Sequence, residues 1–581
     1  MKNTFIVDDY PRPQFRRKSF INLNGAWDFA FDFEGKGEEL GFSKGFTKER
    51  DIIVPFAYEA ELSGIGSEKR CDDVWYQRHF EYHKTDKRLL LHLEGADYES
   101  AVYVNGILVG KEEGAYHRKS FDLTDALKDG DNLLVIHCHD DYSKEKPRGK
   151  QRSEDHNYGC WYVDTTGIYK PVWMEEVSPF YLSSLHITPN VDEEEVTLSL
   201  FVEGKGFVEA NILVSYEGEN VTSKKEELHE GENVLSLAIK NPHLWGSLDP
   251  HIYDLDITLE KAGEKSDEVK SYFAFRKVYA KNQKVYLNDK PFYQKLILDQ
   301  GYFLKGKLTA DNEEALLQDI KLMMQIGFNG ARKHQKIEDE RFYYYADMLG
   351  YVVWGEMPSM YALTDLSKTR FEKEYKEVLK QLYNHPSIIT WVPFNESWGI
   401  DDIATNKDTQ AFVNHIYDVT KAYDPTRFCI SNDGWEHTKS DLITIHDYSQ
   451  EGPTLIEKFA TREKAVTLPY EWRGKKAFVD GYQYEGQPIL LTEFGGSAYQ
   501  NDYGKENKSW GYGEGVKDDD DYLSRLSSLV KATLEIPCFE GYCYTQLSDV
   551  EQEVNGLVRE NRAYKVKESS LKEIFSLERK E

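Results

Sequence analysis

Short segments that alternate apolar and polar residues, separated by turns, fill the first part of the chain. Two of them, 88–94 and 101–110, are typical of strands, and the second holds an Asn105-Gly106 pair between two apolar runs. Asn-Gly in that position is the strongest short-range signal of a β-hairpin. The pattern predicts an N-terminal β-sandwich of the jelly-roll type over residues 1–180.

A second set of alternating segments extends to about residue 280, with glycine-containing turns at 203–204, 217–218 and 230–233. A run of about a hundred residues with such strands suits an immunoglobulin-like β-sandwich. We therefore expect this second domain over residues 181–280.

After Lys284 the pattern changes to an apolar strand, a turn and a long amphipathic helix, repeated to the end of the chain. The candidate strands are 292–298, 327–332, 351–354, 388–394, 428–431, 442–446, 489–492 and 541–545. The candidate helices include 312–326, 337–349 and 370–384. Eight strands alternating with helices predict a C-terminal (β/α)8 TIM barrel over 281–581. A doubly wound sheet is the alternative, but no glycine-rich phosphate loop follows the first strand.

Polar or ionisable side chains follow every one of the eight predicted strands. In a (β/α)8 barrel the carboxyl ends of the strands meet at one face, which carries the working residues. The side chains expected at this face are Asp299, Gln300, Arg332, His334, Glu356, Asn395, Glu396, Asp433, Trp435, His446, Tyr448, Glu493 and Tyr544. Loops are polar in any barrel, so the pattern favours catalysis over a scaffold role by a small margin.

Glu396 and Glu493 each end an apolar strand, and strands four and seven lie across the mouth of an eight-stranded barrel from each other. Two facing carboxyl groups suit cleavage of a glycosidic bond: one protonates the leaving oxygen and the other stabilises or captures the oxocarbenium-like centre. A separation of about 5–5.5 Å gives retention, and about 6.5–9.5 Å gives inversion. The residues themselves leave this choice open.

The surroundings of the two carboxyl groups predict their roles. Glu396, beside a neutral amide and near Trp398, should have its pKa raised by burial and by the opposing carboxylate, which suits an acid that later acts as a base. Glu493 has to stay ionised to attack, and Tyr448 or Arg332 can donate the hydrogen bonds that keep it so. A single glutamate at a strand end is more often a salt-bridge partner, but two after apolar strands favour catalysis.

Histidines and tryptophans near the strand ends are candidates for binding a metal ion or a sugar. His334, His437 and His446 match no metal-binding spacing, so neither a metal nor a cofactor is predicted. The tryptophans that follow strands, and could stack on a sugar face, are Trp398, Trp435 and Trp472.

Composition and charge limit the classes of molecule that the chain is expected to bind. Aromatic residues make up 14% of the chain, including 39 Tyr and 11 Trp, a level that suits sugar stacking as well as tyrosine-rich strands. The net charge of -29 argues against nucleic acid and anionic membranes. The chain has no cationic opening followed by an apolar run and no stretch near ~18 apolar residues, which predicts a cytoplasmic location. Its 6 scattered cysteines indicate neither disulfides nor a thiolate metal site.

Several motifs together resemble glycoside hydrolase family 2, the β-galactosidase and β-glucuronidase family. The run from His385-Pro386-Ser387 to Asn395-Glu396-Ser397 resembles its acid/base signature, and Thr492-Glu493-Phe494-Gly495 resembles its nucleophile segment. The first domain resembles its sugar-binding jelly roll at 23–29, 74–80, 102–106 and 166–173. The resemblance implies a retaining, exo-acting β-glycosidase with Glu396 as acid/base and Glu493 as nucleophile. It also implies that Arg332 and Tyr448 lie beside the nucleophile.

The chain departs from the family pattern at positions that contact the sugar. Leu298-Asp299-Gln300 replaces the family's Asn-Arg-His after strand one, and Trp161 stands where a first-domain aspartate is usual. No Asn-x-Lys of the glucuronidase kind occurs in 546–562 after strand eight, and no acidic cluster matches the magnesium site of large galactosidases. These changes keep the expected reaction and leave the sugar open.

The leading hypothesis is a β-glycosidase acting on a terminal galactose-like sugar of a small carbohydrate or glycoside. Glucuronide, glucoside, arabinopyranoside and mannoside are the alternatives. The residues expected to bind the sugar are Asn395, Asp299, Gln300, His334, Asp433, Trp435 and His446. A carbohydrate-binding protein with an inactive barrel is the rival from another class, and the presence of both glutamates argues against it. Members of the family are commonly dimers or tetramers, so a homo-oligomer is compatible with the resemblance.

Overall fold

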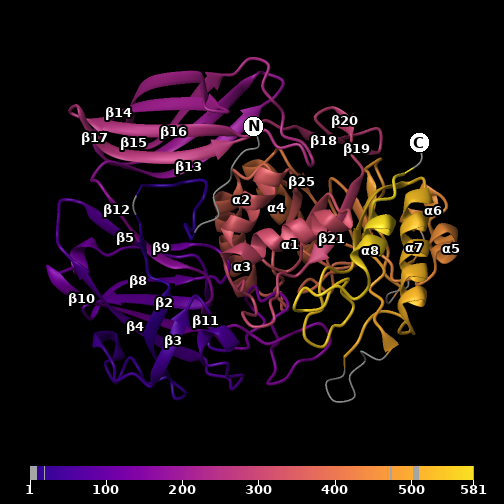
Figure 1. Cartoon of the computed structure of the whole chain (residues 1–581), viewed down its shortest axis with the longest axis horizontal. Helices are drawn as coiled ribbons and strands as arrows, with labels where there is room; N and C mark the ends of the chain where they lie inside the picture. The colour runs from indigo at the N-terminus through magenta and orange to yellow at the C-terminus, as the bar shows by residue number, and fades with distance from the viewer. Residues whose placement is uncertain (1–8, 19, 468, 471–473, 501–508, 580–581) are drawn as a thin grey trace.

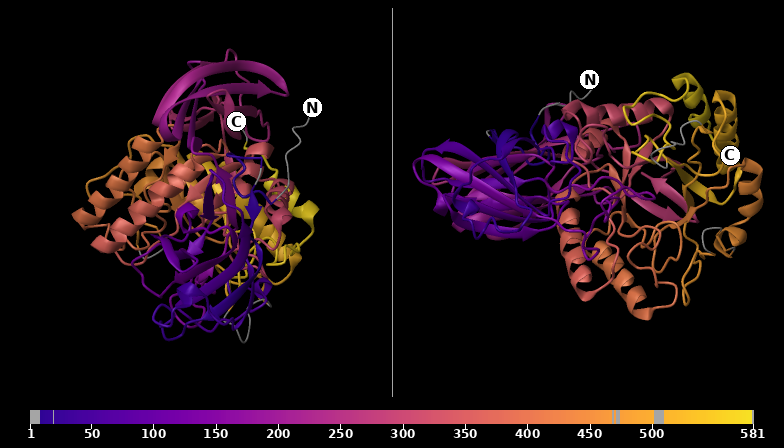
Figure 2. Two further views of the ribbon diagram at one scale, coloured as in Figure 1. Left: turned by 90° about the vertical axis from the view of Figure 1, so that its left-hand side faces the viewer. Right: turned by 90° about the horizontal axis from the view of Figure 1, so that it is seen from below.

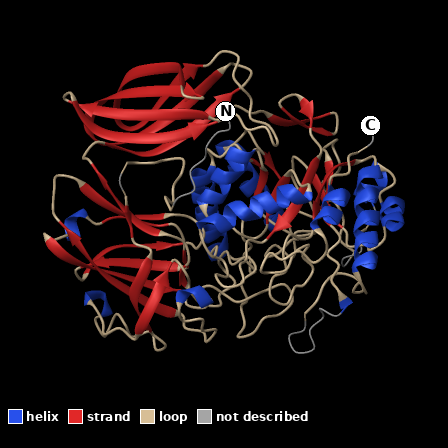
Figure 3. Ribbon diagram, viewed as in Figure 1, coloured by secondary structure: helices blue, strands red, loops and turns tan. Residues whose placement is uncertain are grey.

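The computed structural model describes residues 9–18, 20–467, 469–470, 474–500 and 509–579. Three domains follow one another along the chain: a β-sandwich, a second β-sandwich, and a barrel surrounded by helices (Figure 1, Figure 3). The first sandwich and the barrel lie side by side, and the second sandwich lies above the first in the view of Figure 1; Figure 2 shows the arrangement from two further sides. The predicted fold class is confirmed.

Two main sheets form the first domain, in the orders β3-β2-β4-β10-β7-β8 and β1-β12-β5-β9, with β6 and β11 paired separately. Its elements are β1 (Ile21–Asn22), β2 (Gly25–Phe31), η1 (Phe42–Lys44), β3 (Arg50–Val54), η2 (Glu61–Ser63), β4 (Asp73–Tyr82), β5 (Arg88–Leu93), β6 (Ala96–Asp97), β7 (Glu99–Val104), β8 (Ile107–Glu113), β9 (Lys119–Asp122), η3 (Thr124–Ala126), β10 (Gly130–His139), β11 (Gly167–Ile168) and β12 (Val172–Val177). Asn105 and Gly106 form the turn between β7 and β8 with φ of 52° and 79°. Two positive φ values are what a two-residue type I′ hairpin turn requires, so this hairpin prediction is confirmed.

The second domain is an antiparallel sandwich built around one long strand. Its strands are β13 (Tyr181–Asn190), β14 (Glu195–Tyr216), β15 (Glu219–Ala238), β16 (Tyr253–Lys261) and β17 (Glu264–Phe273). The first half of β14 pairs with β13 and its second half pairs with β16, while β15 follows it along both halves. Inward side chains such as Leu198, Ile212 and Leu255 form a separate apolar core.

Eight parallel strands form the barrel of the third domain, after a small sheet of β18 (Val278–Lys281), β19 (Lys284–Leu287) and β20 (Lys290–Pro291). The barrel strands are β21 (Gln294–Asp299), β22 (Gly330–Lys333), β23 (Val352–Glu356), β24 (Ile388–Val392), β25 (Phe428–Cys429), β26 (Ile443–His446), β27 (Ile489–Glu493) and β28 (Phe539–Tyr544). Every predicted barrel strand is present, with ends shifted by a few residues. The ladder runs from β25 through β21 to β26, and among the described residues β25 and β26 are not paired with each other.

Helices lie outside the barrel strands (Figure 3). They are α1 (Glu313–Ile326), α2 (Glu340–Leu349), α3 (Asp365–Leu382), α4 (Lys407–Tyr423), α5 (Gly452–Lys458), α6 (Arg462–Thr467), α7 (Asp519–Glu535) and α8 (Glu568–Phe575). α3 begins earlier than predicted, because Thr364 and Ser367 form a capping box that satisfies backbone N–H groups of the first turn. No helix in the described part of the chain is long and apolar enough to cross a bilayer.

The first domain is joined to the barrel by buried polar contacts. The carboxylate of Glu374 on α3 accepts hydrogen bonds from the backbone N–H groups of Ala115 and Tyr116, both at 2.7 Å. Arg118 forms an ion pair with Glu340 at the start of α2. These contacts fix the position of the first-domain loops relative to the barrel.

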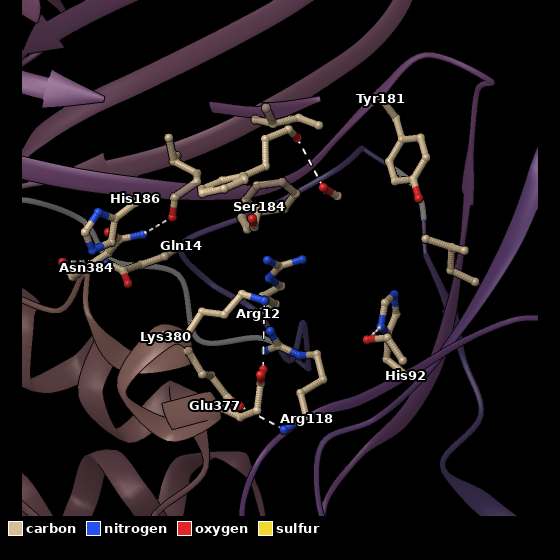
Figure 4. Close-up of a pocket in the computed structure, with 18 of the residues that line it drawn as sticks. Arg12, Gln14, His92, Arg118, Tyr181, Ser184, His186, Glu377, Lys380 and Asn384 are labelled. Atoms are coloured by element: carbon tan, nitrogen blue, oxygen red, sulfur yellow. Dashed lines mark hydrogen bonds and ion pairs between the residues drawn. The ribbon is translucent and has the colours of Figure 1, made fainter. Parts of the chain in front are cut away.

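A cavity of about 620 Å³ lies where the three domains meet. Figure 4 shows His92 and Arg118 of the first domain, His186 of the second, and Lys380 and Asn384 of the α3 region around it. Its lining comes from the two sandwiches, the N-terminal segment and the outer helices, not from the carboxyl ends of the barrel strands. The cavity is therefore distinct from the site expected at the barrel mouth.

Candidate active site at the barrel mouth

The carboxyl ends of the barrel strands bring most of the predicted residues into one hydrogen-bonded group. Its members are Arg332, Glu356, Asn395, Glu396, Asp433, His446, Tyr448 and Glu493. They come from β22, β23, β26 and β27 and from the turns after β24, β25 and β26. Parallel strands end on the same side of a barrel, which is why residues so far apart in sequence meet here.

Glu493 ends β27 and receives donors on both carboxylate oxygens. Arg332 Nη1 donates to Oε1 at 2.8 Å, and the Tyr448 hydroxyl donates to Oε2 at 2.6 Å. Nδ1 of His446 lies 3.4 Å from Oε2. Hydrogen bonds and cations at this range favour the ionised form of a carboxyl group.

Arg332 is fully buried and connects four strand ends. Its Nε lies 2.7 Å from Glu356 Oε2 and 2.8 Å from Asp433 Oδ2. Its Nη2 donates to Asn395 Oδ1 at 2.6 Å. This contact fixes the amide of Asn395 so that its oxygen is used, while its Nδ2 has no partner among the described residues. The Asn395 NH2 group is therefore a buried donor that none of the described residues uses.

Glu396 lies just beyond β24 in a backbone conformation that is uncommon outside glycine. φ is 51° at Glu396 and 60° at Ser397, in the left-handed region, which costs energy and is often found at functional sites. The turn is held by Glu396 N donating to Asp433 O at 2.9 Å and by Ser397 N donating to Asn432 Oδ1 at 3.0 Å. It brings Glu396 Oε1 to 2.8 Å from His446 Nδ1.

The electrostatics of the group separate the two glutamates. Burial and the field of Glu493 raise the pKa of Glu396. Burial also works against the ionised form of Glu493, but His446 and Arg332 outweigh it and lower the pKa of that carboxyl group. Burial disfavours the imidazolium of His446, yet Glu493, Asp433 and Glu396 raise the pKa of His446 to about 10. One carboxyl group is thus poised as an acid and the other as an anion.

The two carboxyl groups face each other at short range. One oxygen of Glu396, one nitrogen of His446 and one oxygen of Glu493 lie within 4.8 Å of one another. Such a triplet could in principle ligate a cation, but a metal ligand has to be a neutral imidazole. The pKa of His446 is raised to about 10, so a cation would have to displace the proton of its ring.

Four further predicted residues lie around this group with different partners. Gln300 donates to Gln546 Oε1 at 2.5 Å and to the Tyr162 hydroxyl at 3.1 Å. His334 lies 2.9 Å from Glu356 through its Nδ1, and its ring is 6.2 Å from that of Trp398. The Trp435 ring meets His446 edge-on at 5.5 Å, and its Nε1 has no partner among the described residues.

Two predicted residues that the structure describes do not join the group. Asp299 uses its carboxylate on Lys333 Nζ at 2.9 Å and on the backbone N–H of Gly301 at 2.8 Å. Tyr544 packs its ring against Phe494 and against Phe575 of α8, in the layer between the barrel and the helices. We therefore do not propose either one as a sugar contact. Trp472 lies outside the described residues.

A first-domain loop lies at the mouth; the resemblance pointed to Trp161 in it, whereas Lys150 and Tyr162 were not predicted as part of the site. Lys150 places its Nζ 5.4 Å from the centre of the Trp398 ring, and Trp161 packs against the same ring at 5.7 Å. The hydroxyl of Tyr162 hydrogen-bonds Glu553 in the loop after β28. Nothing in the pattern of a polar loop announces such contacts, because they depend on how two domains dock.

Tyr512 also belongs to the surroundings of the nucleophile candidate. Its ring stacks on that of Tyr448, with centres 3.4 Å apart and planes 4° apart. The stack fixes the direction of the Tyr448 hydroxyl towards Glu493. Tyr512 lies in the long loop after β27, which has no strand or helix pattern of its own.

Comparisons with known proteins agree with this architecture. The model of the TIM barrel domain of glycosyl hydrolases family 2 matches residues 278–576, a second model of that family matches 180–276, and a galactose-binding domain-like model of glycosyl hydrolase 2 matches 57–171. A β-galactosidase of Thermoanaerobacterium thermosulfurigenes is 24% identical over 83% of this chain and 65% of its own length. The match spans less than two thirds of the length of each of the first curated relatives.

Solved structures share the fold. A β-glucuronidase from Ruminococcus gnavus in complex with D-glucuronic acid has a TM-score of 0.79 at 17% identity, covering 97% of this chain and 99% of that one. A GH2 β-galacturonidase from Eisenbergiella tayi, bound to glycerol, has a TM-score of 0.75 at 18% identity, covering 98% and 99%. Since the barrel model alone matches about half of the chain and the two other models match the domains before it, the chain belongs to glycosyl hydrolases family 2.

Proposed function

We propose that the chain is a retaining, exo-acting β-glycosidase that hydrolyses a terminal β-linked sugar by double displacement through a glycosyl-enzyme intermediate. Glu493 is the nucleophile and Glu396 the acid/base. The observation that carries the proposal is the short approach of one oxygen of Glu396 to one oxygen of Glu493, within 4.8 Å, together with the opposite shifts of the pKa values of the two carboxyl groups. Retaining glycosidases hold the pair about 5–5.5 Å apart, whereas inverting ones leave about 6.5–9.5 Å for a water molecule.

The first step uses the two carboxyl groups in their different states. The anionic Glu493 attacks the anomeric carbon, while protonated Glu396 gives its proton to the leaving glycosidic oxygen. Arg332 and Tyr448 hold both oxygens of the nucleophile. In the second step Glu396, now ionised, takes a proton from the water that attacks the glycosyl ester, and Glu493 leaves.

Loops over one side of the mouth support exo action. Gln552 Nε2 donates to the carbonyls of Gly159 and Trp161 at 3.0 and 2.9 Å, and Trp510 Nε1 donates to the Gly159 carbonyl at 2.8 Å. These bonds tie the first domain to the loops after β27 and β28 across that side. A polymer chain running through the site would meet them, whereas a terminal sugar would not.

The identity of the sugar stays a proposal with two candidates. A galactose-like sugar is the first, as in the β-galactosidase relative. A glucuronide or another uronide is the second, as in the two solved relatives named for such activities. The specific observation that favours the second is Lys150 beside Trp398, a cation that has no ion-pair partner among the described residues.

The decisive experiment follows hydrolysis of a panel of 4-nitrophenyl β-glycosides by NMR. Retention requires the β-anomer of the sugar to appear first, and an α-anomer as the first product would refute double displacement. Glu493→Gln should lose at least about 10⁴-fold in kcat, since the nucleophile is essential to the reaction path. Glu493→Gln that still turns over normally, or binding of sugars by wild type without any turnover, would favour the binding-protein reading instead.

A further inference from the structure

We propose that Lys150, delivered by the first domain, binds a carboxylate on the sugar that is cleaved off, so that the chain selects uronic acid glycosides over neutral ones of the same ring configuration. The inference rests on the proposed function and names the substrate class of the same site. It assigns recognition to a residue outside the barrel.

Lys150 is exceptional among the buried lysines. Seven described lysines are buried: Lys119, Lys146, Lys150, Lys170, Lys295, Lys333 and Lys336. Six of them hydrogen-bond or ion-pair with protein acceptors; Lys146, in the same loop, lies 2.7 Å from Asp141, and Lys333 lies 2.9 Å from Asp299. Lys150 is 6% exposed, and no described carboxylate lies within ion-pair distance of it and no described acceptor hydrogen-bonds its Nζ. A buried ammonium without an anion is costly, so a partner from outside the chain is expected.

The ammonium lies where substrate has to enter. Its Nζ is 5.4 Å from the ring centre of Trp398, two residues beyond Glu396, and 5.9 Å from that of Tyr162. The Tyr162 hydroxyl in turn receives the hydrogen bond of Gln300 at the end of β21. Lys150 Nζ is not fully buried, so it borders accessible space.

The charges around Lys150 keep it cationic without neutralising it. Burial lowers its pKa, but the fields of Cys160, Glu553, Glu493 and Glu396 more than compensate, and the pKa is raised. Each of the three glutamates already has donors of its own. Glu493 receives Arg332 and Tyr448, Glu396 contacts His446, and Glu553 receives Tyr162 and Asn555. A substrate carboxylate would therefore meet a free cation and carboxylates that are already bound.

A neutral sugar can accept a hydrogen bond from Lys150 but cannot balance its charge. A site built around a charged group discriminates strongly against the analogue that lacks the matching charge, because the buried group is then left unpaired. The cation of Lys150 therefore selects for a sugar that carries a carboxylate, while other contacts distinguish the two configurations at C4. Glucuronides and galacturonides both fit this requirement.

The test compares four 4-nitrophenyl β-D-glycosides that separate charge from configuration: galactoside, galacturonide, glucoside and glucuronide. Wild type should prefer a uronide over its neutral partner by about 100-fold or more in kcat/KM. Lys150→Met should remove that preference by lowering kcat/KM for the uronide, chiefly through KM, while neutral glycosides change less than about threefold. Lys150→Arg should recover part of the uronide activity, because the cation is kept. Lys144→Met, an exposed lysine of the same loop, is the matched control and should behave as wild type.

Other outcomes would overturn the proposal in distinguishable ways. If wild type prefers neutral glycosides, or if Lys150→Met lowers turnover of all four glycosides equally, Lys150 does not bind a carboxylate of the sugar. The β-glycosidase assignment would still stand. A fifth substrate, 2-carboxyphenyl β-D-galactoside, carries its carboxylate on the leaving group. If the effect of Lys150→Met appears only there, the anion belongs to the leaving-group side and the assignment to the sugar is wrong.

Calorimetric titration with free D-glucuronate, D-galacturonate, glucose and galactose covers the case in which no glycoside is cleaved. That result would remove the proposed function. Tighter binding of either uronate than of its neutral partner, lost in Lys150→Met, would keep the role of Lys150 in a binding protein. Equal binding of uronates and neutral sugars would contradict that role of Lys150.

Discussion

Removal of one hydroxyl group, in Tyr448→Phe, isolates the contact that prepares Glu493 for attack. The Tyr448 hydroxyl lies 2.6 Å from Glu493 Oε2, a length typical of a hydrogen bond to an ionised acceptor. The ring stacks on Tyr512, with centres 3.4 Å apart, so phenylalanine should keep the same position. Arg332 remains 2.8 Å from the other carboxylate oxygen. The substitution therefore removes this hydrogen bond, together with a longer contact of the hydroxyl to Thr545 Oγ1 at 3.2 Å, and leaves the rest of the group in place.

The size of the effect follows from the strength of that bond. A hydrogen bond to a charged group contributes about 1.5–3 kcal/mol. At about 1.4 kcal/mol per factor of ten, its loss corresponds to a rate reduction of about 10- to 150-fold if the bond supports the reacting state. The pKa of Glu493 is lowered in the folded protein, and loss of a donor to the anion raises it again.

The assay is the pH dependence of kcat/KM for the best nitrophenyl glycoside. Glu493 has to be ionised to attack, so its protonation sets the acidic limb of the profile. In Tyr448→Phe this limb should move to higher pH, while the alkaline limb, set by loss of the proton of Glu396, should move little. Tyr470→Phe removes a buried hydroxyl whose described hydrogen bond goes to the Ala465 carbonyl and not to the group around Glu493, and it should leave both limbs unchanged. An acidic limb that stays in place, with kcat within threefold of wild type, would show that Tyr448 does not tune the nucleophile.

Three further predictions concern stability and loop position. Arg332→Met leaves the buried carboxylates of Glu356, Asp433 and Glu493 without their cation, and denaturant titration should show a loss of about 3–5 kcal/mol in the free energy of unfolding. The pKa of His446 is raised to about 10 from an ordinary value of about 6.5, so its charge contributes fully to stability below about pH 6.5 and the contribution disappears as the pH rises through about 10. Melting temperatures should fall over this window in wild type, and less in His446→Gln. Gly149 has φ of 61°, and a Cβ there would lie 2.4 Å from the Gln335 carbonyl oxygen, so Gly149→Ala should displace the loop of Lys150 and lower kcat/KM for the best nitrophenyl glycoside by about 100-fold. Gly474→Ala has a similar φ of 67° with nothing within 4 Å, so it controls for backbone strain alone.

The barrel and its two glutamates could be predicted from sequence because one rule links them. Parallel barrel strands are apolar along their length, and the residue at which the apolar run stops marks the carboxyl end. The runs before Glu396 and Glu493 stop in this way, and the structure brings both residues within reach of His446. The boundaries differ by a few residues because polar groups can also be buried inside the strands; Gln294, fully buried at the start of β21, accepts a hydrogen bond from Trp354.

The same rule explains why sequence alone predicts Tyr544 at the mouth. Strands of a parallel barrel are buried on both faces, so their sequence does not alternate and does not reveal which residues point inward. In β28 the ring of Tyr544 points to Phe575 of α8, and it is the next residue, Thr545, whose Oγ1 lies 3.2 Å from the Tyr448 hydroxyl. A displacement of one residue moves a side chain from the mouth to the helix layer.

The contacts of Lys150 and Tyr162, which could not be predicted, come from the first domain. They indicate that this domain forms part of the candidate active site. A carbohydrate-binding sandwich attached to a complete barrel would leave the barrel mouth intact when removed. Here Gln300 and Glu553 of the barrel both use the Tyr162 hydroxyl as their partner, and Trp398 is covered by Trp161 and Lys150. Removing the sandwich would take one hydrogen-bond partner from each of those buried polar groups and expose the tryptophan, which is costly on both counts. The first domain is therefore a wall of the candidate active site: Trp161 belongs to that wall and Gln300 of the barrel hydrogen-bonds it, while the reacting pair is kept.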